Sequence, residues 1–410
     1  VTETQKNAVD GNNIVTTLDY NVQSIIEKCI LEYNEEKPSK NTAVVVADPS
    51  NGEILGMASY PTFNLNDPRK LTGMYTDEEI KDMSDEEYRN NLYSLWTNYC
   101  VSESYEPGST FKPVTVASAL EEGVVKDGDT YVCKGFETVA DYKLKCHVFS
   151  TIGSHGSLTV EQALMNSCNP YMIHLALEMG NSRFAYYQSL FGFGKITGID
   201  LPGETTGIVY GDRMTTIDAA CNSFGQTINV NMMQMMAAYC SIINGGMLYQ
   251  PHIVKRIESA NGEVVKEYKA NLVRQTITAS TSKLLRRYLK NTVEEGTAKK
   301  AGVTGYSVAG KTGTAQKGDR KDNKWIISFI GHAPAENPKF AIYVVIDEPY
   351  GTTGTSGSSA DVLTLTHNIL EKLLPYMNVY KDASDEYEDT SSSPDELTVD
   401  GIPAGTASSN

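Results

Sequence analysis

The stretch Tyr105-Glu-Pro-Gly-Ser-Thr-Phe-Lys-Pro113 decides how this 410-residue chain is interpreted. It contains Ser109 and Lys112, three residues apart, and it leads into the apolar run 114–120, which predicts a buried helix. Proline is tolerated only in the first turn of a helix, so the helix begins at or beside Ser109. Residues three apart lie one turn apart on the same helix face, so the lysine amine can reach the serine hydroxyl.

This spacing offers a nucleophile and its base. A serine hydroxyl needs an adjacent base in order to attack, and a desolvated lysine with a lowered pKa can be that base. The helix N-terminus adds partial positive charge where an alkoxide would form. The alternative is structural, with a serine that caps the helix and a lysine that extends its ammonium into solvent. The pair alone does not decide between them.

Composition narrows the class of protein. The chain has 35 Lys and Arg against 51 Asp and Glu, a net charge of −16 that argues against a nucleic-acid partner. No apolar run approaches the length of a membrane span, and no signal peptide is visible. The chain begins with Val1 rather than Met, so we expect a fragment, which leaves room for a targeting or anchoring segment upstream. Seven cysteines, an odd number, do not indicate a disulfide scaffold.

Strand signals lie near both ends of the chain and helix signals mostly in the middle. Residues 42–47 and 54–58 flank a turn at Asp48-Pro-Ser-Asn-Gly52 and predict a β-hairpin. Strand-like runs return at 307–315, 325–331 and 340–346. We therefore predict an α/β fold of the α+β kind, an antiparallel sheet flanked by helices with a largely helical inserted subdomain. The other predicted elements are a strand at 14–17, helices at 19–33, 76–91, 158–166, 171–179, 280–293 and 358–374, and a hairpin at 252–270.

Three parts are expected along the chain. Residues 1–13 are a linker from an upstream region, residues 14–375 are the folded domain, and residues 376–410 are an acidic tail or linker. That last segment has eight Asp and Glu residues and one Lys, with many Ser and Gly, which is typical of disorder.

Two further short motifs follow Ser109-x-x-Lys112, namely Ser167-x-Asn169 and Lys311-Thr-Gly313. Each alone has a structural explanation, the first as a helix cap or turn and the second as an exposed strand end. Together, in this order and each on a fitting element, they form the motif set of the penicillin-recognising serine enzymes.

Over roughly residues 14–375 the chain resembles the transpeptidase domain of class B penicillin-binding proteins, in particular the division, elongation and sporulation enzymes of Gram-positive bacteria. The resemblance implies a penicillin-binding/serine β-lactamase-like fold. It also implies a peptidoglycan D,D-transpeptidase that β-lactams inhibit by acylating Ser109. Besides the three motifs, it is carried by the hairpin with Asp48 and Gly52, Asp200-Leu-Pro-Gly203, Ser223-Phe-Gly-Gln226, Asn244-Gly-Gly246 and Gly296-Thr297.

The resemblance assigns the acyl-transfer steps to the first two motifs. Ser109 would attack the penultimate D-Ala carbonyl of a stem peptide, and Lys112 would take the hydroxyl proton. Ser167 would relay a proton to the leaving D-Ala. Asn169 would hold Lys112 and the substrate amide.

The third motif would bind the end of the substrate. Lys311 would supply positive charge for the terminal carboxylate, and Thr312 and Thr314 would bind it through their hydroxyls. Gly313 would let the substrate lie close against the strand. The backbone N–H groups of Ser109 and Thr314 would form the oxyanion hole.

Cysteine and histidine gather between the first two motifs, at Cys133, Cys146, His147 and His155. Zinc prefers these ligands in tetrahedral Cys2His2 or Cys2His(Asp) sites, so they predict a structural Zn²⁺ near the active-site mouth, with Asp141 as the candidate fourth ligand of the second kind of site. The chemistry itself requires no cofactor. The alternatives are a disulfide between Cys133 and Cys146, or unrelated thiols beside a turn histidine, because this spacing is not a standard zinc signature. The remaining histidines are expected to be structural, namely His174, His252, His332 and His367.

Three other functions share these motifs, those of a serine β-lactamase, a D,D-carboxypeptidase and a non-catalytic β-lactam sensor. A β-lactamase needs a base for deacylation, often a Glu, and no Glu follows Asn169 in a matching pattern. A carboxypeptidase would pass the acyl group to water. A sensor would keep Ser109 and Lys112 but would need no second substrate.

The resemblance also implies partners and a location. Stem peptides and β-lactams would be the ligands, and a membrane glycosyltransferase would be the partner. An upstream pedestal domain and a membrane anchor would hold the domain at the extracytoplasmic face of the bacterial cell membrane.

Overall fold

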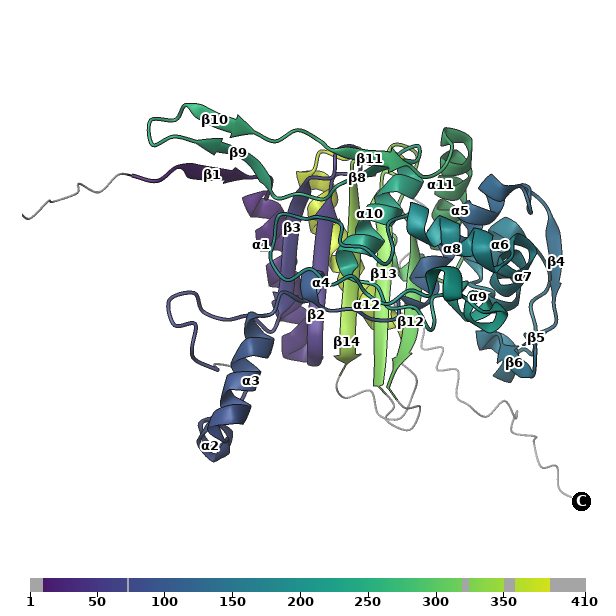
Figure 1. The fold of residues 1–410 in the computed structure, drawn as a ribbon, viewed down its shortest axis with the longest axis horizontal. Coiled ribbons are helices and arrows are strands. Elements are labelled where there is room, and N and C mark those ends of the chain that lie inside the picture. The colour runs from purple at the N-terminus through teal and green to yellow at the C-terminus, as the bar shows by residue number, and fades with distance from the viewer. Residues whose placement is uncertain (1–9, 72–73, 319–323, 350–357, 384–410) are drawn as a thin grey trace, which may run out of the picture.

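A computed structural model describes residues 10–71, 74–318, 324–349 and 358–383 (Figure 1). Its centre is an antiparallel sheet of five strands in the order β12-β13-β14-β2-β3. Val44 lies opposite Val344, so the first and last parts of the chain pair in mid-sheet. The predicted antiparallel sheet and the hairpin at 42–58 are confirmed. The strands are β2 (Ser39–Ala47), β3 (Ile54–Tyr60), β12 (Ala309–Lys317), β13 (Lys324–Ala333) and β14 (Phe340–Pro349).

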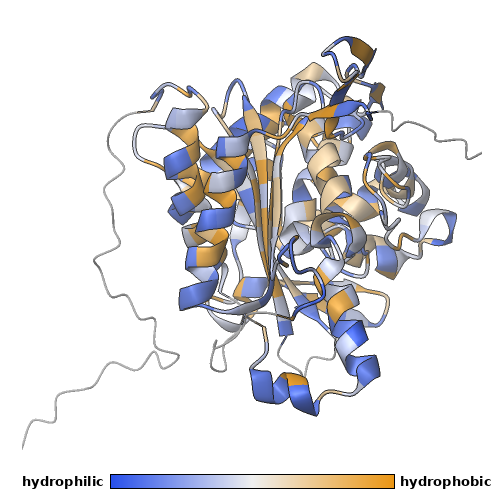
Figure 2. Cartoon of the chain, turned by 90° about the vertical axis from the view of Figure 1, so that its left-hand side faces the viewer, coloured by the Kyte–Doolittle hydropathy of each residue, from blue (hydrophilic) through white to orange (hydrophobic). Residues whose placement is uncertain are grey.

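Helices cover both faces of this sheet (Figure 2). Alternate residues of a strand point to opposite faces, and the two hydrophobic cores divide accordingly. Val44 packs with α1 (Tyr20–Glu36) and α12 (Ser359–Tyr376), whereas Val45 belongs to the larger core shared with the central helices. No described helix is both long and apolar enough to cross a membrane.

The inserted part is mostly helical, as predicted, and the three motifs lie where it meets the sheet. Short strands interrupt it, with β4 paired to β7 and β5 paired to β6. Its helices are α5 (Lys112–Glu122), α6 (Val160–Met165), α7 (Asn169–Met179), α8 (Asn181–Leu190), α9 (Thr216–Asn222), α10 (Met232–Ile243) and α11 (Ala279–Glu294). Its short strands are β4 (Thr130–Cys133), β5 (Phe136–Val139), β6 (Tyr142–Lys145), β7 (Gly156–Thr159), β8 (Met247–Tyr249) and β11 (Leu272–Gln275). The single turns are α4 (Tyr99–Ser102), η1 (Gly108–Phe111), η2 (His147–Ser150), η3 (Gly211–Arg213) and η4 (Lys299–Ala301).

Two elements differ from the predictions. The acidic patch 76–91 forms two helices, α2 (Asp77–Asp82) and α3 (Asp85–Trp96), because Ser84 accepts a backbone hydrogen bond and caps a new helix. The predicted N-terminal strand, β1 (Asn13–Thr16), does not join the main sheet. It pairs with β9 (Val254–Glu258), which forms the predicted 252–270 hairpin with β10 (Val264–Glu267).

The folded domain extends beyond the predicted boundary at residue 375. Val379 is buried, and the Asp382 carboxylate accepts the backbone N–H of Ser307 over 2.7 Å. Residues 376–383 therefore pack on the domain. Residues 384–410 of the predicted tail, and residues 1–9 of the predicted linker, lie outside the described residues.

Candidate active site

Ser109 lies in η1, the single turn that leads into α5, and its backbone is held from two sides. The Gly108 N–H donates to Gly225 O over 2.9 Å. Gly108 has a φ of +57°, and a Cβ there would lie 2.6 Å from Thr314 O. Only glycine accepts this conformation and this closeness without strain. The serine is therefore fixed between the Gly225 turn and strand β12.

Lys112 is fully buried, and its ammonium joins the first motif to the second. Its Nζ donates to Ser167 O over 2.6 Å, to Ser167 Oγ over 3.0 Å and to Asn169 Oδ1 over 2.7 Å. Burial lowers the pKa of Lys112 to about 8, since a charged amine is poorly solvated in the interior. About a tenth of Lys112 is thus neutral at pH 7, and the neutral form is the one that a general base requires.

The second motif lies in the turn between α6 and α7. Ser167 has a φ of +53°, which turns the chain sharply, and Cys168 stands at the N-cap of α7. Asn169 opens α7, with Pro170 in the first turn, where no intrahelical N–H is needed. The Asn169 Nδ2 donates to Lys145 O over 3.3 Å, which ties the motif to β6.

The third motif lies on β12, at the edge of the sheet. Lys311 is fully buried, and its Nζ donates to Thr312 O over 3.1 Å. Burial, and then the nearby charge of Lys112, lower the pKa of Lys311 well below its usual value. A bound carboxylate would favour the charged form again.

Gly313 is required for a reason that the sequence did not indicate. A Cβ there would lie 2.5 Å from Ser328 Oγ, 2.8 Å from Pro107 O and 2.9 Å from Thr110 Cγ2. These atoms belong to the protein itself, so the glycine lets β12 pack against η1. The predicted role of Gly313, close approach of a substrate to the strand, stays a prediction.

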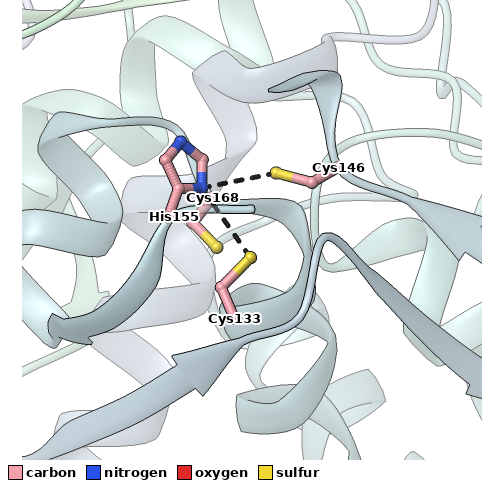
Figure 3. A group of neighbouring side chains, drawn as sticks. All are labelled: Cys133, Cys146, His155 and Cys168. Carbon is pink, nitrogen blue, oxygen red and sulfur yellow. Dashed lines mark hydrogen bonds between the residues drawn. The ribbon is translucent and has the colours of Figure 1, made fainter. Parts of the chain in front are cut away.

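Three cysteines and one histidine converge beside the second motif (Figure 3). The ligand atoms of Cys133, Cys146, His155 and Cys168 all lie within 4.8 Å of one another. His155 Nδ1 is 3.6 Å from Cys146 Sγ and 3.8 Å from Cys133 Sγ. The three cysteines are buried and free, so the alternative of a Cys133–Cys146 disulfide is not what the structure contains.

The predicted ligand set needs one correction. His147 is exposed and contacts Cys146 at 3.8 Å, but it does not belong to the convergent group, and neither does Asp141. Cys168 takes that place. The sequence prediction missed it because it is the middle residue of the Ser-x-Asn motif, whose other two residues were assigned to acyl transfer.

Comparison with known proteins shows which family this chain is similar to. The penicillin binding protein transpeptidase domain matches residues 42–371. Stage V sporulation protein D of Bacillus subtilis is 38% identical over 377 residues, which cover 90% of this chain and 54% of that protein. The peptidoglycan D,D-transpeptidase FtsI of Escherichia coli K12 is 29% identical over 91% of this chain and 58% of its own length. The chain thus spans little more than half of these relatives.

Solved structures agree with the sequence comparison. Penicillin binding protein 3 from Mycobacterium tuberculosis, complexed with ampicillin, superposes with a TM-score of 0.79 at 27% identity and covers 94% of this chain and 82% of that one. The fold, the order of the three motifs and these comparisons lead to one conclusion. The chain belongs to the transpeptidase domain family of class B penicillin-binding proteins.

Proposed function

We propose that this domain is a peptidoglycan D,D-transpeptidase that works through an acyl-enzyme on Ser109. The observation that carries the proposal is the environment of Lys112. Its buried amine, with a pKa lowered to about 8, contacts both Ser167 and Asn169. The Lys112 backbone N–H donates to Ser109 O, so the two residues lie in the same helical turn.

In the acylation step, Ser109 Oγ attacks the penultimate D-Ala carbonyl, and neutral Lys112 accepts the hydroxyl proton. The backbone N–H groups of Ser109 and Thr314 stabilise the oxyanion. The C–N bond to the terminal D-Ala then breaks, and the proton reaches the leaving amine through Ser167, whose Oγ is 3.0 Å from Lys112 Nζ. The products are a seryl ester and free D-Ala.

The third motif positions the substrate for this step. The terminal carboxylate lies against Lys311, Thr312 and Thr314 on the edge strand β12. An edge strand offers unpaired backbone groups, so the stem peptide can add to the sheet as a further strand. In the second step an amine of another stem peptide attacks the ester, a peptide bond forms as the ester C–O bond breaks, and the proton lost by the amine returns to Ser109 Oγ.

Labelling with a fluorescent penicillin tests the proposal. The wild-type domain should form a stable adduct, and it should also cross-link or hydrolyse a D-Ala-D-Ala or thioester substrate. Ser109→Ala should abolish labelling, because no other nucleophile occupies that position. Labelling that survives in this variant would overturn the proposal.

The same assay separates the three alternatives. Rapid turnover of the adduct indicates a β-lactamase. Transfer of the acyl group to water, with no cross-linked product when an acceptor amine is present, indicates a carboxypeptidase. A stable adduct with no activity toward either substrate indicates a sensor.

We also propose that Cys133, Cys146, Cys168 and His155 hold a structural Zn²⁺. In a tetrahedral Cys3His site, bond lengths of ~2.3 Å to sulfur and ~2.0 Å to nitrogen separate sulfur from nitrogen by ~3.6 Å. The two sulfur–nitrogen distances of 3.6 and 3.8 Å match that value. The hydrogen bond between the two thiols lowers the pKa of Cys146 and raises that of Cys168, so the pair shares a proton that metal binding would release. The ion would shape the site mouth and takes no part in the acyl-transfer steps.

Metal analysis of protein purified without chelator tests this site. One zinc per chain is expected, and Cys133→Ser should lose it while His147→Ala keeps it. Absence of metal in the wild type, with two of the cysteines joined in a disulfide, would contradict the site.

The location and partner follow from the substrate. We place the domain at the extracytoplasmic face of the cell membrane, where stem peptides are cross-linked, with a membrane glycosyltransferase supplying the strands. The similarity to a stage V sporulation protein and to FtsI supports an envelope role. Fractionation of cells expressing the full-length protein would test this location.

A further inference from the structure

Thr297 takes no part in the mechanism above, yet it touches the elements that carry the second and third motifs. It follows α11 and rests on the end of α6. Its backbone N–H and its hydroxyl each donate to Met165 O over 3.3 Å. Met165 is the last residue of α6, two positions before Ser167.

The preceding glycine makes this approach possible. A Cβ at Gly296 would lie 2.6 Å from Met165 Cγ and 2.7 Å from Met165 O. Any larger residue would push the turn away from α6. Gly296 and Thr297 therefore pack against Met165 in a contact that requires a glycine at position 296.

The same hydroxyl also faces the carboxylate-binding motif. Thr312 Oγ1 donates to Thr297 Oγ1 over 3.5 Å, and Lys311 Nζ donates to Thr312 Oγ1 over 3.5 Å. A line of polar atoms therefore runs from the Lys311 ammonium through two hydroxyls to the Met165 carbonyl. It connects β12 with the helix that precedes Ser167.

We propose that Thr297 is a positioning residue that directs the Thr312 hydroxyl toward the terminal carboxylate of a stem peptide or β-lactam. The proposal rests on the proposed transpeptidase function. A hydroxyl has one hydrogen to donate and two lone pairs that accept. Without a ligand, Thr312 gives its hydrogen to Thr297, and Thr297 gives its own to Met165 O.

Carboxylate binding reverses one of these bonds. Thr297 turns its hydrogen from Met165 O to Thr312 Oγ1, and the Thr312 hydrogen is then free to donate to the carboxylate. Met165 O keeps the backbone N–H of Thr297, so no acceptor is left unpaired. Because the backbone N–H of Thr297 also bonds Met165 O, the Thr297 hydroxyl can change its hydrogen-bond partner while the turn stays in place.

Thr297→Val tests this role, because it keeps the shape of the side chain and removes the donor and acceptor. The measurement is the second-order rate constant for acylation of Ser109 by benzylpenicillin and by its methyl ester, which lacks the free carboxylate. The variant should react about tenfold more slowly with the acid, because the loss of one net hydrogen bond in the transition state changes the rate by about that factor. Its rate with the ester should stay within about twofold of wild type, because the effect acts only through the carboxylate.

Matched variants keep the test decisive. Thr297→Ser keeps the hydroxyl and should restore the rate with the acid. Thr364→Val, an exposed threonine of α12 away from the site, should change neither rate. If Thr297→Val unfolds, Thr297→Ala should show the same selective loss.

Two results would overturn the role of Thr297. One is an unchanged rate with the acid. The other is an equal slowing with acid and ester together with a lower Tm, which would mean that Thr297 only holds the turn. Labelling that persists in Ser109→Ala would instead count against the proposed transpeptidase, so the two failures are distinguishable.

Discussion

At the scale of single residues, the protonation of Lys112 should control the rate of acylation. Burial lowers its pKa to about 8, so the neutral form that accepts the serine proton increases as the pH rises through that value. The second-order rate constant with penicillin should rise with pH up to about 8 and then level off. Stopped-flow labelling between pH 6 and pH 10 measures this profile.

Lys112→Met should lose acylation at every pH. Lys134→Met, at an exposed lysine in the neighbouring strand excursion, provides the control and should keep the wild-type profile. A rate that is flat from pH 6 to pH 9 would contradict the role of Lys112 as the base.

Gly313 should tolerate no side chain. In Gly313→Ala the new methyl group would collide with Pro107 O, Thr110 Cγ2 and Ser328 Oγ, so β12 must move away from η1. We expect a loss of about 1–3 kcal/mol in the free energy of unfolding, as for other overpacked sites, together with slower acylation. Denaturant unfolding measures the loss. Gly11→Ala, where nothing lies within 4 Å of the new atom, should be neutral and serves as the control.

The candidate site could be predicted from the sequence where its residues are close in the chain. The spacing of Ser109 and Lys112 fixes their relation, because both lie in one helical segment. Cys168 could not be assigned to the metal group in this way, since nothing local relates it to Cys133, 35 positions earlier. Their proximity depends on how β4 and α7 pack, which the sequence pattern does not give.

At the scale of elements, the sequence placed most helices and strands correctly because their signals are local. The hairpin at 42–58 follows from its turn residues, and the helix α11 follows from its periodicity. The sequence predicted strand β1 but not its partner, because β1 pairs with β9, more than 200 positions away in the chain. The division of α2 from α3 was missed because an acidic, helix-favouring composition hid the Ser84 cap.

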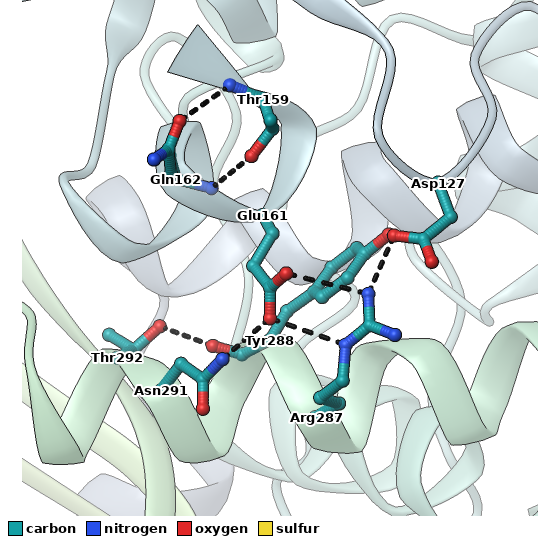
Figure 4. A network of polar contacts seen from close by, with 8 residues as sticks. All are labelled: Asp127, Thr159, Glu161, Gln162, Arg287, Tyr288, Asn291 and Thr292. Carbon is teal, nitrogen blue, oxygen red and sulfur yellow. Dashed lines mark hydrogen bonds and ion pairs between the residues drawn. The ribbon is translucent and has the colours of Figure 1, made fainter.

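A network of polar contacts joins α11 to α6 and should stabilise the second motif from a distance (Figure 4). Glu161 of α6 accepts from Asn291 Nδ2 over 2.6 Å and from Arg287 Nε over 3.3 Å. Because Arg287 is 43% exposed, solvent weakens the ion pair. Glu161→Ala should therefore lower the free energy of unfolding by only about 1 kcal/mol.

Thermal and denaturant unfolding measure the contribution of Glu161, and a second variant on α11 supplies the comparison. Glu294→Ala removes an ion pair within the helix, with Lys290, and should cost about 0.3 kcal/mol. If the two substitutions cost the same, Glu161 does not join the helices in the way the structure indicates.

At the scale of the whole molecule, the fold class followed from where the strand signals lie. Strands near both ends and helices between them predict one sheet with an insertion, and that arrangement is confirmed. The order of the strands could not be derived from the pattern, because each buried strand offers similar apolar faces to any neighbour. The packing of residues 376–383 was also missed, since an acidic composition gave no sign of the Ser307–Asp382 bond.

Removal of the proposed metal should loosen one side of the molecule. Its ligands come from β4, from the segments before η2 and β7, and from the start of α7, so the ion would join them to the second motif. Incubation with 1,10-phenanthroline should lower the Tm, by about 1–2 °C for each kcal/mol of stability lost in a domain of this size. The non-chelating isomer 1,7-phenanthroline should have no effect. An unchanged Tm after verified metal loss would contradict a structural role.

The pairing of Val44 with Val344 also determines when the proposed active site can be complete during synthesis of the chain. Strands β2 and β3 are synthesised early, but three of the five strands, including the one with Lys311, come last. Contacts between residues so far apart in the chain form late in folding, because bringing the residues together costs a large loss of chain entropy. A nascent chain therefore contains the proposed nucleophile and base long before it contains the strand proposed to bind a substrate carboxylate. We expect the proposed site to be complete only when the final strands have joined the sheet.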